Sequence, residues 1–332
     1  MAMAPSRVLP TPDDVAAAAR RIAGHVLETP VFRHPALDAA AGATVLVKAE
    51  CLQLTGSFKI RGATNRLAQI APGTAPGGVV AFSSGNHAQG VARAARRLGL
   101  AAEIVMPADV PAVKRDGVRG DGAAIRTYDR ETESREAIAE ALAAERGAVL
   151  VPSYDDPDIV AGQGTAGLEF ARQADAMGGP LDALICCTGG GGLIAGITLA
   201  LEATSPATRI WTAEPDGHDD WARSLAAGMP VSNAPGTRSI CDAILTPTPG
   251  RIPWAVMKDR LAGGLSVSDG EVREAIRFAF RHLKLVLEPG GAVALAAALR
   301  GLGPDLAGGR VGLVLSGGNV DPQAYAAILS QS

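Results

Sequence analysis

A lysine with unusual neighbours stands in the stretch LTGSFKIRGA, which covers residues 54–63. Lys59 lies between Phe58 and Ile60, directly after a glycine–serine turn, whereas surface lysines usually stand among polar residues. The side chain is therefore either an ordinary solvated lysine or a buried amine. Burial would disfavour the ammonium form and lower the pKa, which makes the amine a nucleophile for a carbonyl group. An aldehyde cofactor with a phosphate arm would need this lysine together with an anion-binding loop.

An anion-binding loop is indicated by TGGGGLIAG, residues 188–196, which joins a predicted strand to a predicted helix. Consecutive glycines let backbone N–H groups approach an anion, and the helix N-terminus adds a favourable dipole. Two alternatives stay open at this point. Gly190, Gly192 and Ala195 also fit a dinucleotide-binding fingerprint, with Glu214 at a suitable distance for a ribose contact. The glycines would also suit close packing of the helix on the strand.

A second polar loop, SSGNH at residues 83–87, opens another predicted helix. Ser83, Ser84 and Asn86 could simply cap that helix. Two hydroxyls, a side-chain amide and free N–H groups would equally bind a carboxylate. The residues alone do not choose between these two interpretations.

Composition excludes several classes of protein. The chain has 332 residues, a formal net charge of −3 and 47% hydrophobic residues, which is enough for one large or two medium domains. The near-neutral charge argues against a nucleic-acid partner, and no segment approaches the roughly 20 apolar residues that span a bilayer. The first 14 residues lack the pattern of a signal peptide. The four cysteines show no C-x-x-C spacing, so we expect reduced core residues in a cytoplasmic protein.

Strands and helices alternate along the chain with short connections, which predicts an α/β fold with parallel sheets covered on both faces. We expect two lobes. Residues 1–75 and 152–332 form a large cofactor-binding domain, and residues 76–151 form a small substrate-binding domain. Four glycine-rich loops, 55–57, 83–86, 188–192 and 316–319, follow predicted strands. Because ligands bind at the carboxyl ends of such strands, the loops predict one cleft with one shared ligand.

Five motifs in order give the chain a family resemblance: KAECLQLTGSFKIRGA, SSGNHAQG, AGQGTAGLE, GGGGL and SGGN. Together they resemble the fold-type II pyridoxal-phosphate enzymes, whose fold is like that of the tryptophan synthase β chain. The match is nearest to the serine/threonine dehydratase and serine racemase group, and it covers about residues 10–322. A dinucleotide site would explain residues 188–214 and leave Lys59, the 83–87 loop and the 316–319 loop without a function.

The resemblance implies a set of pyridoxal 5'-phosphate contacts. Lys59 would form the internal Schiff base, and Ser316 would face the pyridine nitrogen. A hydroxyl stabilises a charged ring less than a carboxylate does, so the ring would be a milder electron sink that favours rapid loss of a β-leaving group over transamination. The remaining contacts would be Phe58 against the ring, Asn86 at the ring hydroxyl, and the phosphate cradle of Gly189, Gly190, Gly191, Gly192 and the N–H of Leu193.

The same resemblance suggests how an amino acid would bind. Its carboxylate would dock on the loop formed by Ser83, Ser84, Gly85, Asn86 and His87. The sequence SSGNH resembles that of serine racemase and of hydroxyaspartate dehydratases. By this resemblance, Ser84 would lie across the cofactor from Lys59 as a second acid/base group. Arg135 resembles an arginine that reaches the distal end of a dicarboxylate, with an ordinary helix-surface arginine as the alternative.

A divalent-cation site is also implied, because AEPDGHDD resembles that of the racemase-like branch. Glu214 and Asp220 would supply carboxylates and His218 its backbone carbonyl, a ligand set that suits Mg²⁺ or Ca²⁺. The alternative is a solvated acidic loop.

Two places depart from the family pattern. Asp242–Ala243 stands where Asp–Gly is common, and LEPGG at residues 287–291 replaces a more usual Pro-Ser/Thr-Ala run. At both places the resemblance therefore does not determine the shape of the substrate pocket.

The expected activity is that of a dehydratase, or ammonia-lyase, acting on a β-hydroxy-α-amino acid of the serine, threonine or 3-hydroxyaspartate class. The products would be a 2-oxo acid and ammonia. A racemase using Lys59 and Ser84 is the alternative, followed by β-replacement and by a phosphate-binding regulator without chemistry. The resemblance further implies a homodimer or homotetramer.

Overall fold

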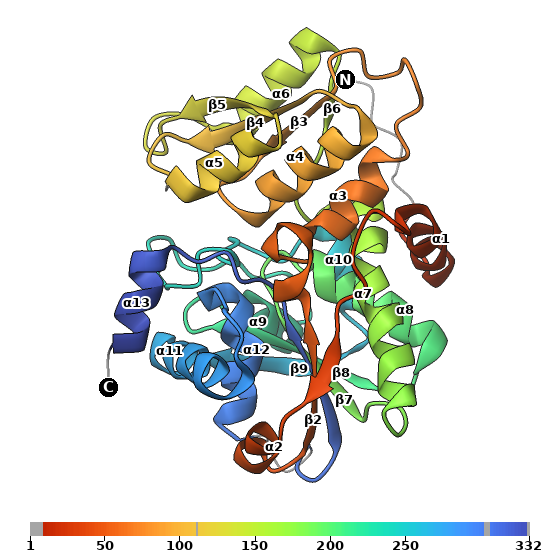
Figure 1. Cartoon of the computed structure of the whole chain (residues 1–332), viewed down its shortest axis with the longest axis vertical. Helices are drawn as coiled ribbons and strands as arrows, with labels where there is room; N and C mark the ends of the chain where they lie inside the picture. The colour runs from red at the N-terminus through yellow and green to blue at the C-terminus, as the bar shows by residue number, and fades with distance from the viewer. Residues whose placement is uncertain (1–8, 111, 302–305, 331–332) are drawn as a thin grey trace.

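A computed structural model describes residues 9–110, 112–301 and 306–330. Residues 1–8, on which the expectation of no signal peptide partly rests, lie outside the described residues. The chain forms two sheets, a six-stranded sheet in the order β1-β2-β10-β7-β8-β9 and a four-stranded sheet in the order β5-β4-β3-β6. Figure 1 shows the two sheets in separate lobes with helices packed around each. The predicted α/β class is confirmed.

The six-stranded sheet forms the large lobe. Its neighbouring strands are parallel except for the antiparallel pair β1 and β2. The strands are β1 (Val31–Arg33), β2 (Thr44–Ala49), β7 (Ala183–Cys187), β8 (Arg209–Pro215), β9 (Leu261–Val267) and β10 (Arg310–Leu315). Strand β9 was not expected from the sequence, because Gly263 and Gly264 interrupt its apolar pattern.

Helices cover both faces of this sheet, and each face has its own apolar core. One group is α1 (Pro12–Ile22), α7 (Pro157–Ala176), α8 (Gly192–Thr204) and α10 (Arg251–Met257). The other is α2 (Pro35–Ala41), α11 (Asp269–Phe278), α12 (Pro289–Leu299) and α13 (Pro322–Ser330). Helix α9 (Asp220–Ala227) lies beside β9 and contributes Trp221 to the core of the first group. Short helical turns are η1 (Glu50–Leu52), η2 (Leu54–Gly56) and the π-helical η3 (Ala279–Leu283).

The four-stranded sheet of the small lobe is entirely parallel. Its elements are β3 (Val79–Phe82), α4 (Asn86–Leu98), β4 (Ala102–Pro107), α5 (Ala112–Gly120), β5 (Ala124–Tyr128), α6 (Arg135–Arg146) and β6 (Val149–Leu150). Its strands fall within the range expected for the small domain, whose assignment to substrate binding stays a prediction. Helix α6 begins at Arg135 rather than near Arg130, because Ser134 is its N-cap and accepts the N–H of Ala137.

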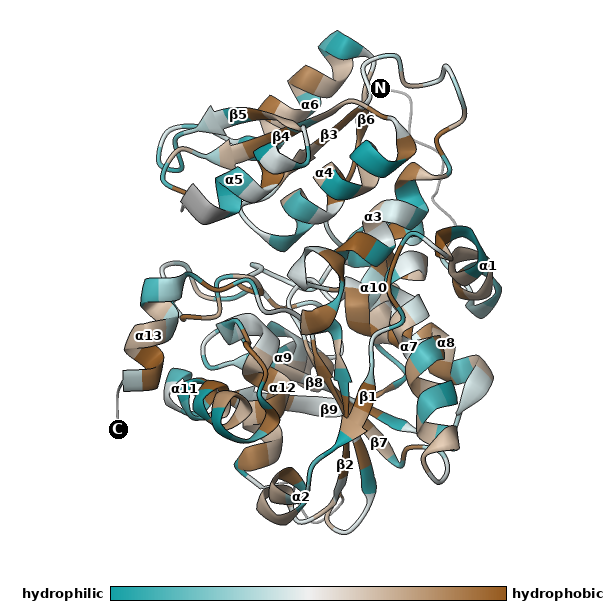
Figure 2. Cartoon of the chain, in the orientation of Figure 1, coloured by the Kyte–Doolittle hydropathy of each residue, from teal (hydrophilic) through white to brown (hydrophobic). Residues whose placement is uncertain are grey.

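Hydropathy follows this layering. In Figure 2, helices α4 and α11 carry hydrophilic and hydrophobic residues together, as expected for helices with one buried face. By contrast, ten consecutive residues of α12, from Pro289 to Ala298, are buried. All four cysteines are free and buried, as predicted. Among the described helices none is long and apolar enough to cross a membrane.

Helix α3 (Lys59–Leu67) lies against both lobes, since it packs on α4 of the small lobe and on α7 of the large lobe. A Cβ atom on Gly162 of α7 would come within 2.7 Å of the Cα of Gly62. A Cβ atom on Gly164 would come within 2.5 Å of the Gly196 carbonyl of α8. The motif AGQGTAGLE therefore allows α7 to approach both α3 and α8 at backbone distance.

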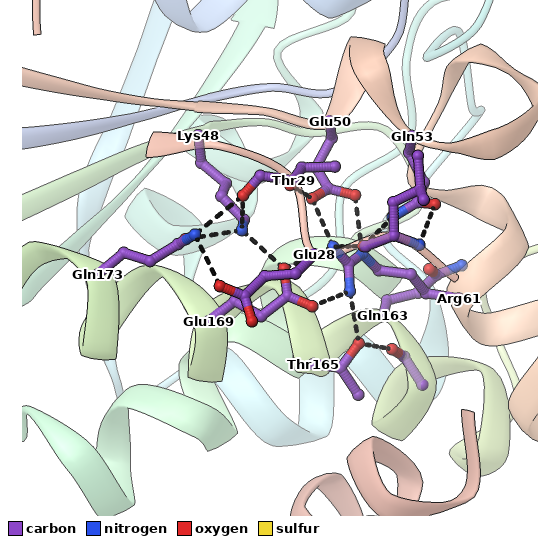
Figure 3. Close-up of polar contacts among 12 residues, drawn as sticks. Glu28, Thr29, Lys48, Glu50, Gln53, Arg61, Gln163, Thr165, Glu169 and Gln173 are labelled. Carbon is purple, nitrogen blue, oxygen red and sulfur yellow. Dashed lines mark hydrogen bonds and ion pairs between the residues drawn. The ribbon is translucent and has the colours of Figure 1, made fainter. Parts of the chain in front are cut away.

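A buried ionic cluster ties α3 to the large lobe (Figure 3). The side chains of Arg61 and Glu50 are both 0% exposed, and two Arg61 nitrogens donate to the two Glu50 oxygens at 2.8 Å. Arg61 also donates to both carboxylate oxygens of Glu169 at 2.7 and 2.8 Å, and Lys48 donates to Glu169 at 2.7 Å. Burial alone would raise the pKa of Glu50, but Arg61 and Lys48 hold that pKa below its usual value. Two cations and two carboxylates thus join β2, η1, α3 and α7.

We predict that Arg61→Met lowers the free energy of unfolding by about 3–5 kcal/mol, because it leaves Glu50 buried without its main partner. Urea unfolding followed by circular dichroism measures this change. The matched control is Arg172→Met, since Arg172 forms an exposed ion pair with Glu28. Such a pair contributes less than about 1 kcal/mol, so equal losses in the two variants would show that buried Glu50 does not depend on Arg61.

Candidate active site

One cavity of about 380 Å³ lies where loops of the two lobes meet. The loops that follow β3, β7 and β10 contribute to its wall, together with the start of α3. The predicted residues that line it are Phe58, Lys59, Ser83, Ser84, Gly85, Asn86, His87, Arg135, Gly189, Gly190, Gly191, Gly192, Leu193 and Ser316. The three predicted metal-site residues, Glu214, His218 and Asp220, are not part of this wall.

The turn before Lys59 is fixed by the loop that follows β10. Ser57 and Gly317 form an antiparallel bridge, and the N–H of Phe58 donates to the carbonyl of Ser316 at 3.2 Å. These backbone bonds place Lys59 and Ser316, which are far apart in sequence, at the same end of the cavity. A Cβ atom on Gly56, whose φ is +71°, would lie 2.3 Å from Oδ1 of Asn319, so this turn requires glycine.

The amine of Lys59 faces the cavity. Its Nζ donates to the carbonyl of Ser153 at 2.8 Å and lies 5.2 Å from the ring centroid of Phe58. Desolvation lowers the pKa of Lys59 to about 8, although the carboxyl of Glu288 opposes this change. Near neutral pH a minor fraction of the amine is therefore uncharged, more than for an ordinary lysine, and this is the form that acts as a nucleophile or proton acceptor.

The glycine loop before α8 leaves its backbone N–H groups open to the cavity. Helix α8 has Gly191 as its N-cap and no side-chain cap. Gly191 has φ +92°, and a Cβ atom there would lie 2.4 Å from the Trp221 ring. A Cβ atom on Gly190 would lie 2.4 Å from the Tyr154 ring. Because side chains are excluded and the helix dipole points at the loop, the geometry suits a phosphate group.

Asn86 is oriented by partners from distant parts of the chain. Its Nδ2 donates to Oε1 of Glu288 at 2.5 Å, and its Oδ1 accepts from Nδ2 of Asn319 at 2.7 Å. Asn319 also donates to the carbonyl of Thr55. One hydrogen of the Asn86 amide thus remains for a ligand. Neither Glu288 nor Asn319 was assigned a role from the sequence, although both stand in the noted runs LEPGG and SGGN.

The 83–87 loop presents hydroxyl and backbone groups to the cavity rather than a positive charge. The hydroxyl of Ser83 accepts the N–H of Gly85 at 3.2 Å. The ring of His87 is bonded through Nε2 to the carbonyl of Val151 at 3.0 Å. Burial and the nearby Lys59 lower the pKa of His87 to about 3, so its imidazole is neutral. His87 therefore supports the loop, and carboxylate binding there would depend on hydroxyl and N–H donors.

Arg135 reaches the cavity wall but is already engaged. Its Nε donates to Glu136 at 2.8 Å, and its guanidinium lies 5.4 Å from the ring centroid of Phe82. The side chain is 44% exposed. The structure thus places Arg135 at the rim, where solvent screens its charge.

The expected Mg²⁺ or Ca²⁺ site is not supported. The two carboxylate oxygens of Glu214 accept the N–H groups of Trp221 and Ala222 at the start of α9, and Oδ1 of Asp220 accepts from Asn233. Of these four carboxylate oxygens, only Oδ2 of Asp220 is left without a partner. Within the described residues, no group of three or more His, Cys, Asp and Glu side chains is placed to hold a metal ion. In the structure Glu214 accepts hydrogen bonds from the first turn of α9, and Asp220 accepts one from the side chain of Asn233.

The two departures from the family pattern lie in contact. A Cβ atom on Gly290 would come within 3.2 Å of the methyl carbon of Ala243. A side chain at residue 290 would therefore make a tight contact with the methyl group of Ala243. Ala243 itself lines the cavity, and Gly290 packs behind it.

Lys114, Ser153 and Tyr154 also line the cavity and were not predicted. Ser153 and Tyr154 follow β6, so their position after a parallel strand was the available signal. Lys114 gave no such signal, because it lies within helix α5.

The fold and the cavity define a two-lobed α/β enzyme that presents a desolvated lysine and a glycine-rich anion loop to one ligand. Comparison with protein families identifies it further. Residues 22–317 match the family described as pyridoxal-phosphate dependent enzyme, and the chain belongs to this family. The residues fit the cofactor. The loop before α8 has no side chains at Gly190 and Gly191 and offers backbone N–H groups to a phosphate, and the Lys59 amine can react with an aldehyde.

Individual relatives cover nearly the whole chain. An L-threo-3-hydroxyaspartate ammonia-lyase from Pseudomonas sp. is 46% identical over 95% of this chain and 97% of its own. Serine racemase from Schizosaccharomyces pombe is 38% identical over 99% and 100%. The crystal structure of a threonine deaminase from T.th. has a TM-score of 0.87 and 42% identity, covering 94% of this chain and 99% of its own. The predicted family, the dehydratase and racemase group, is confirmed.

We predict a pH-dependent stability that Glu288→Gln removes. Burial raises the pKa of Glu288 from 4.5 to about 7, against the hydrogen bond from Asn86. Between these values the folded protein holds a proton that the unfolded chain has lost, so the free energy of unfolding falls as the pH rises. Relative to wild type, the cofactor-free glutamine variant should gain about 2–3 kcal/mol between about pH 5 and pH 8.

Urea unfolding at several pH values measures this difference, and the amide of the variant can still accept from Asn86. Glu140→Gln on the exposed face of α6 is the control, for which no such gain is expected. A pH-independent difference for Glu288→Gln would show that this carboxyl is ionised throughout.

Proposed function

We propose that this protein is a pyridoxal-phosphate-dependent ammonia-lyase that dehydrates a β-hydroxy-α-amino acid to a 2-oxo acid and ammonia. The observation that carries the proposal is the Lys59 amine, which has a lowered pKa and faces a cavity bordered by the glycine loop and Ser316. The relatives named as ammonia-lyase and deaminase support this reaction class. When bound, the cofactor supplies an electron sink for the bond that breaks at the α-carbon.

The residues of the chain bind the substrate, remove its α-proton and hold the cofactor ring. Backbone N–H groups and hydroxyls of the 83–87 loop bind the substrate carboxylate at the start of α4, where the helix dipole favours an anion. Lys59 removes the α-proton, because a pKa of about 8 leaves part of its amine free near neutral pH. Ser316, whose hydroxyl lines the cavity, would hold the ring nitrogen through a neutral group, and the bound cofactor would then be a milder electron sink than one paired with a carboxylate. Loss of the β-hydroxyl is therefore favoured over slower reactions.

We further propose 3-hydroxyaspartate as the preferred substrate. The cavity wall contains two cations besides Lys59, namely Lys114 and Arg135, and a second substrate carboxylate could pair with one of them. The relative that is 46% identical is an L-threo-3-hydroxyaspartate ammonia-lyase.

We predict that the purified protein is yellow and releases a 2-oxo acid from one member of a defined panel. The panel is L- and D-serine, L-threonine, and threo- and erythro-3-hydroxyaspartate. Lys59→Ala should lower this turnover by at least about 1000-fold, because it removes both the cofactor linkage and the base. Lys258→Ala, an exposed lysine at the end of α10, is the control. Full activity in homogeneous Lys59→Ala protein would exclude the proposed mechanism.

Racemisation is the second candidate, because Ser84 lines the same cavity as Lys59 and serine racemase is among the relatives. We predict that Ser84→Ala lowers the ratio of racemisation to elimination of L-serine by about 100-fold, since a second acid/base group is needed only to reprotonate the opposite face. Chiral chromatography and 2-oxo acid release on one sample give this ratio. An unchanged ratio would show that another group delivers the proton.

A further inference from the structure

One ion pair joins the two lobes across the cavity wall. Nζ of Lys114, on α5 of the small lobe, donates to Oδ2 of Asp242, on a loop of the large lobe, at 2.8 Å. Both residues line the cavity. The side chain of Lys114 is 13% exposed, whereas that of Asp242 is 58% exposed. The cation is thus held inside the wall, and its partner carboxylate reaches it from the solvent side.

Lys114 lies beside the loop proposed to bind the substrate carboxylate. Its Nζ is 3.9 Å from the position that a Cβ atom on Gly85 would occupy. A second carboxylate on a substrate docked at this loop would therefore come near Lys114. Arg135 is a weaker candidate, because it is 44% exposed, is paired with its neighbour Glu136 and lies over the Phe82 ring.

Charge balance explains why a cation is needed there. A dicarboxylic substrate brings a second negative charge into a cavity that already holds the carboxyl groups of Glu136, Asp155, Asp242 and Glu288. Enclosing a carboxylate without a partner is costly. Lys114 can exchange Asp242 for the substrate at little cost, because the released Asp242 is more than half exposed and remains hydrated.

We propose that Lys114 binds the distal carboxylate of a dicarboxylic β-hydroxy amino acid, and that Asp242 takes the place of that carboxylate when no such substrate is bound. This proposal rests on the proposed ammonia-lyase function and deepens it. Lys114 is a specificity-determining residue, and it takes no part in breaking a bond. Its ammonium would form a charge-assisted hydrogen bond that a serine substrate cannot make.

The first test compares specificity constants in the holoenzyme. Lys114→Met keeps most of the apolar stem and removes the charge. It should lower the ratio of kcat/KM for L-threo-3-hydroxyaspartate to kcat/KM for L-serine by about 30-fold, the usual effect of losing a hydrogen bond between charged groups. The loss should appear mainly in KM. Lys258→Met, at an exposed site, should leave the ratio unchanged, and Arg135→Met tests the competing cation.

A second test does not depend on turnover. Succinate and butyrate, which differ by one carboxylate, are titrated against wild type and Lys114→Met holoenzyme by isothermal calorimetry. Wild type should bind succinate at least about tenfold more tightly than butyrate, and Lys114→Met should lose this preference. Asp242→Asn, which removes the competing carboxylate, should strengthen succinate binding.

The outcomes separate the two proposals. Failure of every substrate in the panel, with a Lys114-dependent preference for succinate, would contradict the proposed function and support the binding site. An unchanged substrate ratio in Lys114→Met, an equal loss with both substrates, or a fall in the ratio only in Arg135→Met would overturn the assignment of Lys114.

Discussion

The buried cluster of Arg61, Glu50, Glu169 and Lys48 is the constraint on which the active site depends (Figure 3). Lys59 and Arg61 are two residues apart at the start of the same helix, so whatever holds Arg61 also holds the reactive amine. Desolvating Lys59 costs free energy, and the chain must oppose any movement that would return this amine to water. A fully paired ionic cluster contributes little net stability but has one satisfactory arrangement. It therefore fixes the position of α3 relative to β2 and α7, and with it the position of Lys59.

The rest of the cavity is assembled by backbone contacts around this fixed helix. The loop after β10 pairs with the turn before Lys59, which brings Ser316 to the same end of the cavity. The loop after β7 meets Tyr154 and Trp221, whose rings leave room only for glycine. Because each of these loops follows a parallel strand, the carboxyl edges of the two sheets supply hydrogen-bond donors from both sides. The lobes differ in role: the large lobe supplies rigid backbone donors, and the small lobe supplies Asn86, His87 and Lys114.

Sequence alone was sufficient for the parts of the site that local patterns encode. That Lys59 and the 188–192 loop share one cavity could be predicted, because glycine-rich loops that follow parallel strands meet at the carboxyl ends of those strands. Glu288 and Asn319 could not be given roles, since their partner Asn86 is 202 and 233 residues away. Lys114 meets Asp242 across 128 residues and has no local signal. Strand β9 was missed for a related reason, because Gly263 and Gly264 suit it only where Trp211 and Ala222 press against them.

The contact between Ala243 and Gly290 shows how a pocket can change without losing its packing. Each residue departs from the family pattern when taken alone, and each would suggest an altered cavity. The two positions are neighbours, however, and a Cβ atom at residue 290 would lie only 3.2 Å from the Ala243 methyl, so glycine at residue 290 avoids a tight contact with it. A close-packed interior tolerates substitutions best when total volume is kept. The neighbouring Asp242 is the carboxylate partner of Lys114. Two adjacent residues of this wall, Asp242 and Ala243, therefore contribute differently, since one pairs with the cation of Lys114 and the other packs against Gly290.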